Sequence, residues 1–167
     1  MQTEKSNDQI QSDLGIQDII ASISERRNVA RERLSSNHAR LLKALKKIKA
    51  THVLVSYCGS GDSGQIDQVQ IFRNNEELKP KQNVRVLVAS GFFNSEQSRW
   101  IEQVKLKTMS LELALEQLVY DWLEAEYAGW ENNDGASGEC TIEITKGEFL
   151  LTHTTYYTES ETTESSL

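Results

Sequence analysis

The stretch THVLVSYCGSGDSGQIDQVQIFR, Thr51–Arg73, decides the fold. Its first part places Val53 and Val55 on one face of a strand, because successive side chains of a strand point to opposite faces. The glycine-rich segment GSGDSG follows, and the same alternation resumes through Val69 and Ile71. Two strands that flank a segment rich in Gly, Asp and Ser predict a β-hairpin with an irregular turn.

Helical periodicity marks two other parts of the chain. Apolar residues recur at helical spacing through residues 14–49, and the cluster Ser35–Asn37 predicts the start of a second helix within them. Residues 110–128 carry the clearest apolar stripe, with Ser110 as the expected N-cap and Gly129 as the stop. We therefore expect a basic helical segment before the hairpin and a longer helix after it.

The remaining strand signals complete the fold class. VRVLVAS, residues 84–90, predicts a third strand, whereas residues 91–107 fit no single pattern. TIEIT and EFLLTHTTYY predict a second hairpin that turns at Lys146 and Gly147. This order of elements predicts an α+β fold, in which an antiparallel sheet built from two hairpins carries helices on one face.

Composition divides the chain into four parts. The polar residues 1–13 and the acidic tail 158–167 are expected to be disordered, because they cannot bury enough apolar surface. Between them we expect a helical segment over residues 14–50 and an α+β domain over residues 51–157.

Charge is distributed unevenly along the chain. The net charge is −7, yet residues 1–50 hold ten Lys and Arg against six Asp and Glu, a net of +4. This basic arm either docks on the acidic remainder of the chain or meets an acidic partner. Nucleic acid would be bound only through the basic N-terminal helices, because the acidic body repels phosphates. The side chains available for that are Arg26, Arg27, Arg31, Arg33, Arg40, Lys43, Lys46 and Lys47.

Cysteine usage and hydropathy indicate a cytoplasmic location. Cys58 and Cys140 lie far apart and show no CxxC spacing, which favours free thiols in a reducing compartment. The N-terminus MQTEKSNDQ is polar, unlike a signal peptide, and VRVLVAS is far too short to span a bilayer. We therefore expect no membrane association.

The Gly-Asp-Ser-Gly segment raises the question of a nucleophilic Ser63. A serine nucleophile needs a base and an orienting acid, and neither the order of the histidines nor the segments around them supply that set. An EF-hand centred on Gly135 also fails, because Trp130 and Thr141 would occupy positions that need oxygen ligands. A different cation site built from both loops stays open, with Asp62, Asp134, Glu131 and Glu139 as possible ligands. Turn formation alone also explains Asp, Asn and Gly in such loops.

Two motifs together resemble a family of small bacterial and phage-encoded domains of unknown function. They are YCGSGDSGQI and GWENNDGASGECTIEI, which match the pattern G-x-GDSGQI followed by GWE-x-NDG-x-x-G over roughly residues 50–157. We call residues 59–66 the GDSG loop and residues 129–138 the NDG loop. The resemblance implies no activity and leaves the N-terminal helices outside. It marks Gly59, Gly61, Asp62, Ser63, Gly64, Gln65, Ile66, Gly129, Trp130, Glu131, Asn133, Asp134, Gly135 and Gly138, with His153 as a further correspondence.

These observations favour a small non-enzymatic binding or regulatory module. We expect it to dock a protein partner at the two loops, and its N-terminal helices offer a route to a homo-oligomer. The alternative is a metal-dependent hydrolase that uses Asp62, Asp134 and His153. The candidate binding residues are Asp62, Ser63, Gln65, Trp130, Glu131, Asn133 and Asp134.

Overall fold

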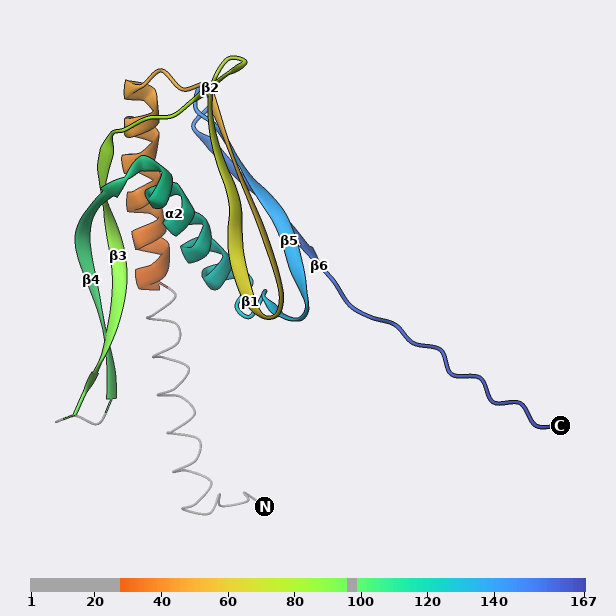
Figure 1. Ribbon diagram of the computed structural model, residues 1–167. Coiled ribbons are helices and arrows are strands. Elements are labelled where there is room, and N and C mark those ends of the chain that lie inside the picture. The colour runs from red at the N-terminus through yellow and green to blue at the C-terminus, as the bar shows by residue number, and fades with distance from the viewer. Residues whose placement is uncertain (1–27, 96–98) are drawn as a thin grey trace, which may run out of the picture.

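Two antiparallel sheets enclose two helices in the computed structural model, which describes residues 28–95 and 99–167 (Figure 1). The larger sheet has the strand order β2-β1-β5-β6 and the smaller has the order β3-β4. The bounds are β1 His52–Arg73, β2 Glu76–Leu78, β3 Asn83–Asn94, β4 Arg99–Ser110, β5 Asn132–Glu143 and β6 Glu148–Thr155. This arrangement confirms the α+β class and the antiparallel sheet.

β1 folds back on itself, as the first hairpin prediction requires. The N–H of Thr51 donates to the carbonyl of Phe72 at 2.7 Å, and the thiol of Cys58 donates to Asp67 at 3.2 Å. These contacts join the two ends of a 22-residue strand, so an inner arm (residues 52–60) and an outer arm (residues 64–73) run antiparallel. The GDSG loop lies where the arms join, at the lower end of the sheet in Figure 1.

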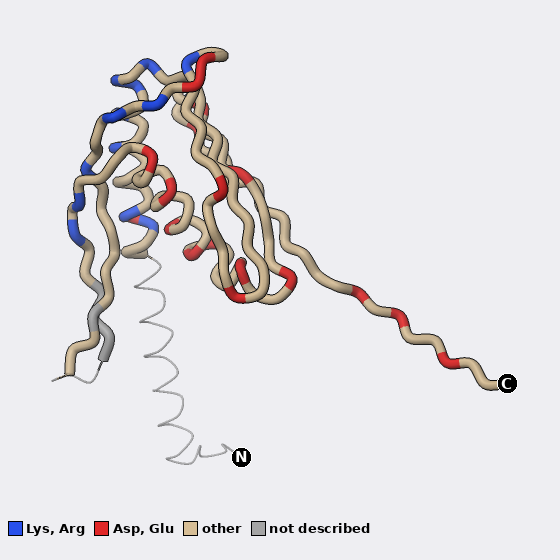
Figure 2. The backbone as a smooth tube through the Cα atoms, viewed as in Figure 1, with Lys and Arg blue, Asp and Glu red and all other residues tan. Residues whose placement is uncertain are grey.

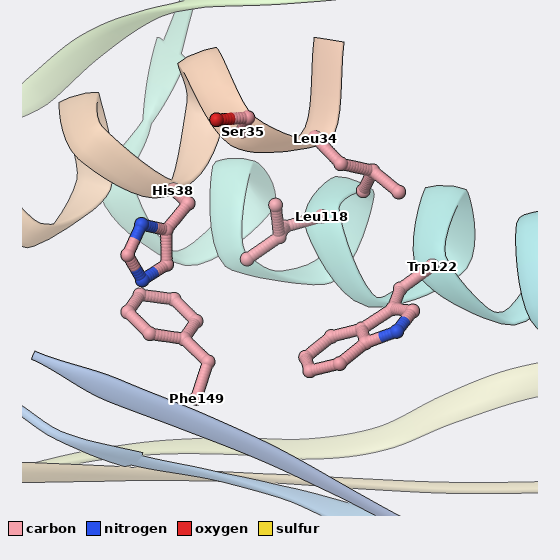
Figure 3. Close-up of a pocket in the computed structure, with 6 residues that line it drawn as sticks. All are labelled: Leu34, Ser35, His38, Leu118, Trp122 and Phe149. Carbon is pink, nitrogen blue, oxygen red and sulfur yellow. The ribbon is translucent and has the colours of Figure 1, made fainter. Parts of the chain in front are cut away.

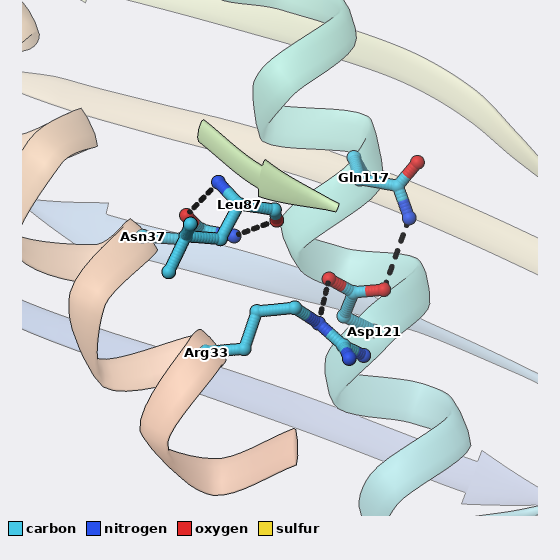
Figure 4. A network of polar contacts seen from close by, with 5 residues as sticks. All are labelled: Arg33, Asn37, Leu87, Gln117 and Asp121. Carbon is cyan, nitrogen blue, oxygen red and sulfur yellow. Dashed lines mark hydrogen bonds and ion pairs between the residues drawn. The ribbon is translucent and has the colours of Figure 1, made fainter. Parts of the chain in front are cut away.

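The N-terminal helix runs without interruption through residues 28–47. The expected start of a second helix at Ser35–Asn37 is therefore wrong. Asn37 is 1% exposed, and its amide bonds the backbone of Leu87 on β3 instead of capping a helix (Figure 4). A tertiary partner thus replaces the local one. Predictions for residues 1–27 lie outside the described residues.

The second helix, α2 (Leu111–Glu126), follows the sequence prediction closely. The Ser110 hydroxyl accepts a hydrogen bond from the N–H of Leu113 at 3.2 Å, which satisfies one of the unpaired donors of the first turn. The helix ends at Tyr127, and Gly129 adopts a positive φ of 77° just beyond it.

Residues 91–94 form the end of β3, and residues 99–107 form most of β4. β3 and β4 pair along their whole lengths and cover the side of the two helices opposite the larger sheet (Figure 1). The smaller sheet confirms the predicted third strand and adds a partner for it. Residues 156–167 are exposed and form neither helix nor strand.

One hydrophobic core joins these layers. The helices contribute Leu41, Leu45, Leu115 and Leu123, and the larger sheet contributes Val55 and Ile142, all 0% exposed. Burial of such side chains stabilises the fold by roughly 1.5–3 kcal/mol each. Among the described helices, none is long and apolar enough to cross a membrane.

Candidate functional site

The GDSG and NDG loops meet at one end of the larger sheet. Gly61 and Asp62 of β1 lie opposite Asn133 and Asn132 of β5, with an irregularity in the register between Gly59 and Gly61. Two motifs that are far apart in the sequence therefore form a single structural unit. We call this unit, residues 59–66 together with residues 129–136, the tip.

Trp130 is a buried residue of the tip, and its position explains why the GDSG loop has glycine at two positions. The indole is 6% exposed, and its ring lies edge-on to Tyr57 with 5.4 Å between ring centroids. A Cβ at Gly59 would lie 2.7 Å from Cζ3 of Trp130, and a Cβ at Gly64 would overlap the same ring. The GDSG loop needs glycine at both positions because its backbone rests directly on the indole.

The NDG loop has a similar requirement at Gly135. Its φ is +76°, and a side chain there would collide with the carbonyl group of Gly59. The backbones of the two loops thus approach more closely than any side chain allows. The glycines of both motifs fix the shape of the tip.

The polar residues of the two motifs remain on its surface. Gln65 donates to the carboxylate of Asp67 at 3.0 Å, and Asp134 accepts a hydrogen bond from the N–H of Thr158. A concavity of about 310 Å³ opens within the GDSG loop and is lined by Cys58, Gly59, Ser60, Ser63, Gly64 and Gln65. The exposed candidate residues here are Asp62, Ser63, Gln65, Asn133 and Asp134. The structure therefore brings these candidates together, with Trp130 as their support.

Glu131 stands out among the acidic residues of the tip. Its Cα lies 3.0 Å from where a Cβ of Gly59 would stand, so it flanks a residue that lines the concavity. Its Oε2 atom is buried and has no hydrogen-bond partner among the described residues. Burial raises the pKa of nearby Glu124, and the charges of Glu131 and Asp121 raise it further. Acidic groups therefore cluster here, and Asp121 has Arg33 and Gln117 as donors, whereas Oε2 of Glu131 has none among the described residues.

His153 has partners other than the aspartates of the tip. Its Nδ1 lies 2.8 Å from the hydroxyl of Tyr57, and its ring stacks on Tyr127 with 3.9 Å between centroids. Burial lowers the pKa of His153 and raises the pKa of Tyr57 to about 12. No three His, Cys, Asp or Glu of the described chain lie together as a metal site would require. The metal-dependent hydrolase remains a prediction.

A second cavity lies between the N-terminal helix, α2 and β6 (Figure 3). It measures about 290 Å³, and the His38 ring packs on Phe149 with 4.0 Å between centroids. Its lining is Leu34, Ser35, His38, Leu118, Trp122 and Phe149. Sequence reasoning missed this cavity, because no local pattern shows that three distant segments will enclose it.

The basic residues lie mostly on the opposite side of the molecule from the tip (Figure 2). Lys43, Lys46 and Lys47 are exposed on the N-terminal helix, whereas Arg33 is 7% exposed and forms an ion pair with Asp121 at 3.2 Å (Figure 4). The basic arm therefore docks on the acidic body through at least one buried ion pair. Arg26 and Arg27 lie outside the described residues.

Comparison with known proteins finds a family of unknown function, as the resemblance implied, and does not test the two motifs themselves. The family model described as "Family of unknown function (DUF6878)" matches residues 34–167. The match begins within the N-terminal helix, so it is wider than the 50–157 range that the motifs alone suggested. No curated protein and no solved structure matches the chain.

Proposed function

We propose that the chain, which belongs to the DUF6878 family of unknown function, is a non-enzymatic binding module that docks a protein partner at the tip. The partner presents a Lys or Arg side chain to the acidic residues around the GDSG concavity. The residues that receive it are Glu131, which flanks Gly59, and the exposed Asp62 and Asp134.

The observation that carries this proposal is the buried Oε2 atom of Glu131, which lacks a hydrogen-bond partner among the described residues. A buried polar atom without a partner costs about 1–3 kcal/mol, and more when it is charged. Native proteins contain few such atoms, and a ligand that completes the hydrogen bonds of Oε2 is the explanation that this proposal adopts. Among protein side chains, Lys and Arg supply both the missing donor and the missing positive charge.

The surroundings of Glu131 support the same partner chemistry. Glu124 and Asp62 add negative charge, and Figure 2 shows acidic residues over α2 and the tip. Trp130 holds the backbone of the GDSG loop in place, so the exposed polar groups are positioned before a partner arrives. Such preorganisation lowers the entropic cost of binding.

Peptide libraries that differ only at the central residue test this proposal. We expect the immobilised full chain to retain peptides with a central Arg or Lys, and to release those with a central Gln or Glu. For a retained Arg peptide, Glu131→Gln should weaken binding, measured by calorimetry, by at least about tenfold. Thermal unfolding checks the variant, which should be no less stable than the wild type, because it removes an uncompensated charge.

Glu112→Gln is the matched control. Glu112 is exposed in the first turn of α2, so the variant removes the same charge from another part of the surface. Its affinity for the Arg peptide should equal that of the wild type. Equal retention of all libraries, or an E131Q variant that binds as tightly as the wild type, overturns the proposal.

A further inference from the structure

Most sheet edges of this protein are protected against pairing with another strand. The Asn37 side chain bonds the backbone of Leu87 (Figure 4). The Arg40 side chain bonds the backbone of Arg85, so the N-terminal helix covers the free edge of β3. β4 carries charged lysines, at positions 105 and 107. Side-chain caps and charges of this kind prevent association between sheet edges.

The edge formed by β1 and β2 is protected as well. β2 is three residues long and carries Glu76 and Glu77. In the outer arm of β1, Asp67 adds a charge and the N–H of Ile66 donates to the hydroxyl of Tyr120 on α2 at 3.0 Å. The short length of β2, the acidic side chains and the contact with α2 together protect this edge against pairing with another strand.

β6 forms the remaining edge of the larger sheet, and apart from Glu148 at its first position it has none of these devices. From Phe149 to Tyr157 the sequence FLLTHTTYY contains no charged residue, Pro or Gly. Leu150 is 64% exposed and Tyr157 is 83% exposed. In the part of the chain that the structure describes, no strand lies on the far side of β6. An edge of this composition is suited to pairing with another strand.

The hydrogen bonds on the inner side of β6 show which backbone groups point outward. The N–H of Tyr156 donates to the carbonyl of Gly135 at 2.9 Å, beyond the paired residues Thr155 and Ala136. Backbone direction alternates along a strand, so even-numbered residues of β6 face β5. The odd-numbered residues therefore direct their N–H and C=O groups toward the free edge; these are Phe149, Leu151, His153 and Thr155.

We infer that β6 pairs antiparallel with β6 of a second copy of this chain, around a two-fold axis at Thr152. The outward-facing residues are placed symmetrically about that position. Leu151 then pairs with His153 of the second copy, and Phe149 with Thr155. A two-fold axis repeats each pair, so all the outward backbone groups of the strand find partners.

Charge complementarity identifies a second copy as the occupant. In this register Lys146, which lies in the turn before β6 and 3.9 Å from Glu148 of its own chain, lies opposite Thr158 of the second copy and beside its Glu159. The paired strands themselves bring no like charges together, although each chain has a net charge of −7. The inference does not depend on the function proposed for the tip, because the pairing uses the outward backbone groups of β6; Tyr156 and Thr158, just beyond β6, contact the tip through Gly135 and Asp134.

Hydrogen exchange of backbone amides, measured on the full chain at low and high concentration, tests this pairing directly. We expect a dimer by sedimentation, and the amides of Leu151, His153 and Thr155 should become at least about tenfold more protected at high concentration. The amides of Thr152 and Thr154 should be protected at both concentrations, because they face β5. A dimer formed through the N-terminal helices would leave the odd-numbered amides unchanged.

Two variants complete the test. Thr152→Lys places two like charges at the two-fold axis, while Glu139 lies opposite Thr152 within the same chain and tolerates the lysine. It should weaken the dimer by at least about tenfold and leave the fold intact. Gln103→Lys, on the already basic edge strand β4, should not change the dimer. A monomer at high concentration, or a dimer that T152K does not weaken, overturns the inference.

Discussion

At the scale of single residues, the GDSG and NDG loops contain two kinds of position. The glycines at positions 59, 64 and 135 allow close approach to Trp130 or to a facing backbone. Asp62, Ser63 and the other polar residues remain exposed on the resulting surface. From the sequence alone, turn formation and binding explain these loops equally well. A glycine that packs on an indole cannot be told from a glycine in a free turn without the structure.

Gly64→Ala tests the packing on Trp130. The added methyl group would overlap the indole ring, so we expect the free energy of unfolding to fall by about 1–3 kcal/mol. Urea unfolding measures this change. Ser63→Ala is the control, because Ser63 is an exposed neighbour, and it should change stability by less than about 0.5 kcal/mol. Equal losses for both variants would contradict the packing argument.

His153 should make stability depend on pH. Burial lowers its folded-state pKa below the ordinary value of 6.5, so the unfolded chain binds its proton more readily. The contribution of His153 to stability is therefore complete above about pH 6.5 and is lost as the pH falls toward the folded-state pKa. Urea unfolding between about pH 8 and about pH 5 should show this loss for the wild type. His153→Gln should show a smaller loss; an identical pH dependence would contradict the assignment.

At the scale of secondary-structure elements, the sequence predicted those helices and strands that are determined by interactions between residues close in the chain. α2 has a strong apolar stripe and its own N-cap at Ser110, and the hairpins have glycine at their turns, so each was predicted. β4 was not predicted. Val104 and Leu106 alternate with Lys105 and Lys107, but this alternation is short, and both apolar side chains are 38% exposed instead of facing a core. The N-terminal helix was divided in the prediction because the partner of Asn37 lies on β3, far away in the sequence.

Asn37→Ala tests that long-range partner. The variant removes both hydrogen bonds to Leu87 and leaves its partly buried N–H and C=O unpaired, so we expect a loss of about 2–4 kcal/mol. Chemical denaturation measures the loss. Ser36→Ala removes only an exposed contact with Arg40 at 3.3 Å and should change stability by less than about 0.5 kcal/mol. An N37A variant as stable as the wild type would show that the hydrogen bonds between Asn37 and Leu87 do not stabilise the packing of the helix on β3.

At the scale of the whole molecule, the N-terminal helix belongs to the single core. Leu41 and Leu45 are fully buried together with residues of both sheets, and the Arg33–Asp121 ion pair links the helix to α2. The uneven charge along the sequence thus becomes two sides of one body (Figure 2). Composition predicted the asymmetry, but it could not show that part of the basic arm is buried.

Removal of residues 1–50 should therefore prevent folding of the remainder. A chain of residues 51–167 would expose the apolar surface that now contacts Leu41 and Leu45, and we expect neither dispersed amide resonances nor cooperative thermal unfolding. A chain that begins at residue 28 is the matched control and should unfold cooperatively. A stable fragment 51–167 would show that the helix is an appendage.

The contact between the GDSG loop and Trp130 constrains how the sequence can evolve. A larger residue at position 64 is compatible with the fold only if position 130 changes to a smaller one, because both compete for the same volume. At position 59 the backbone of Glu131 restricts the space as well. Substitutions at positions 64 and 130, which lie far apart in the gene, are therefore tolerated only in combination. Random mutagenesis of a destabilised Gly64 variant should recover suppressor mutations at codon 130. Substitutions at position 64 or position 130 alone should accumulate slowly.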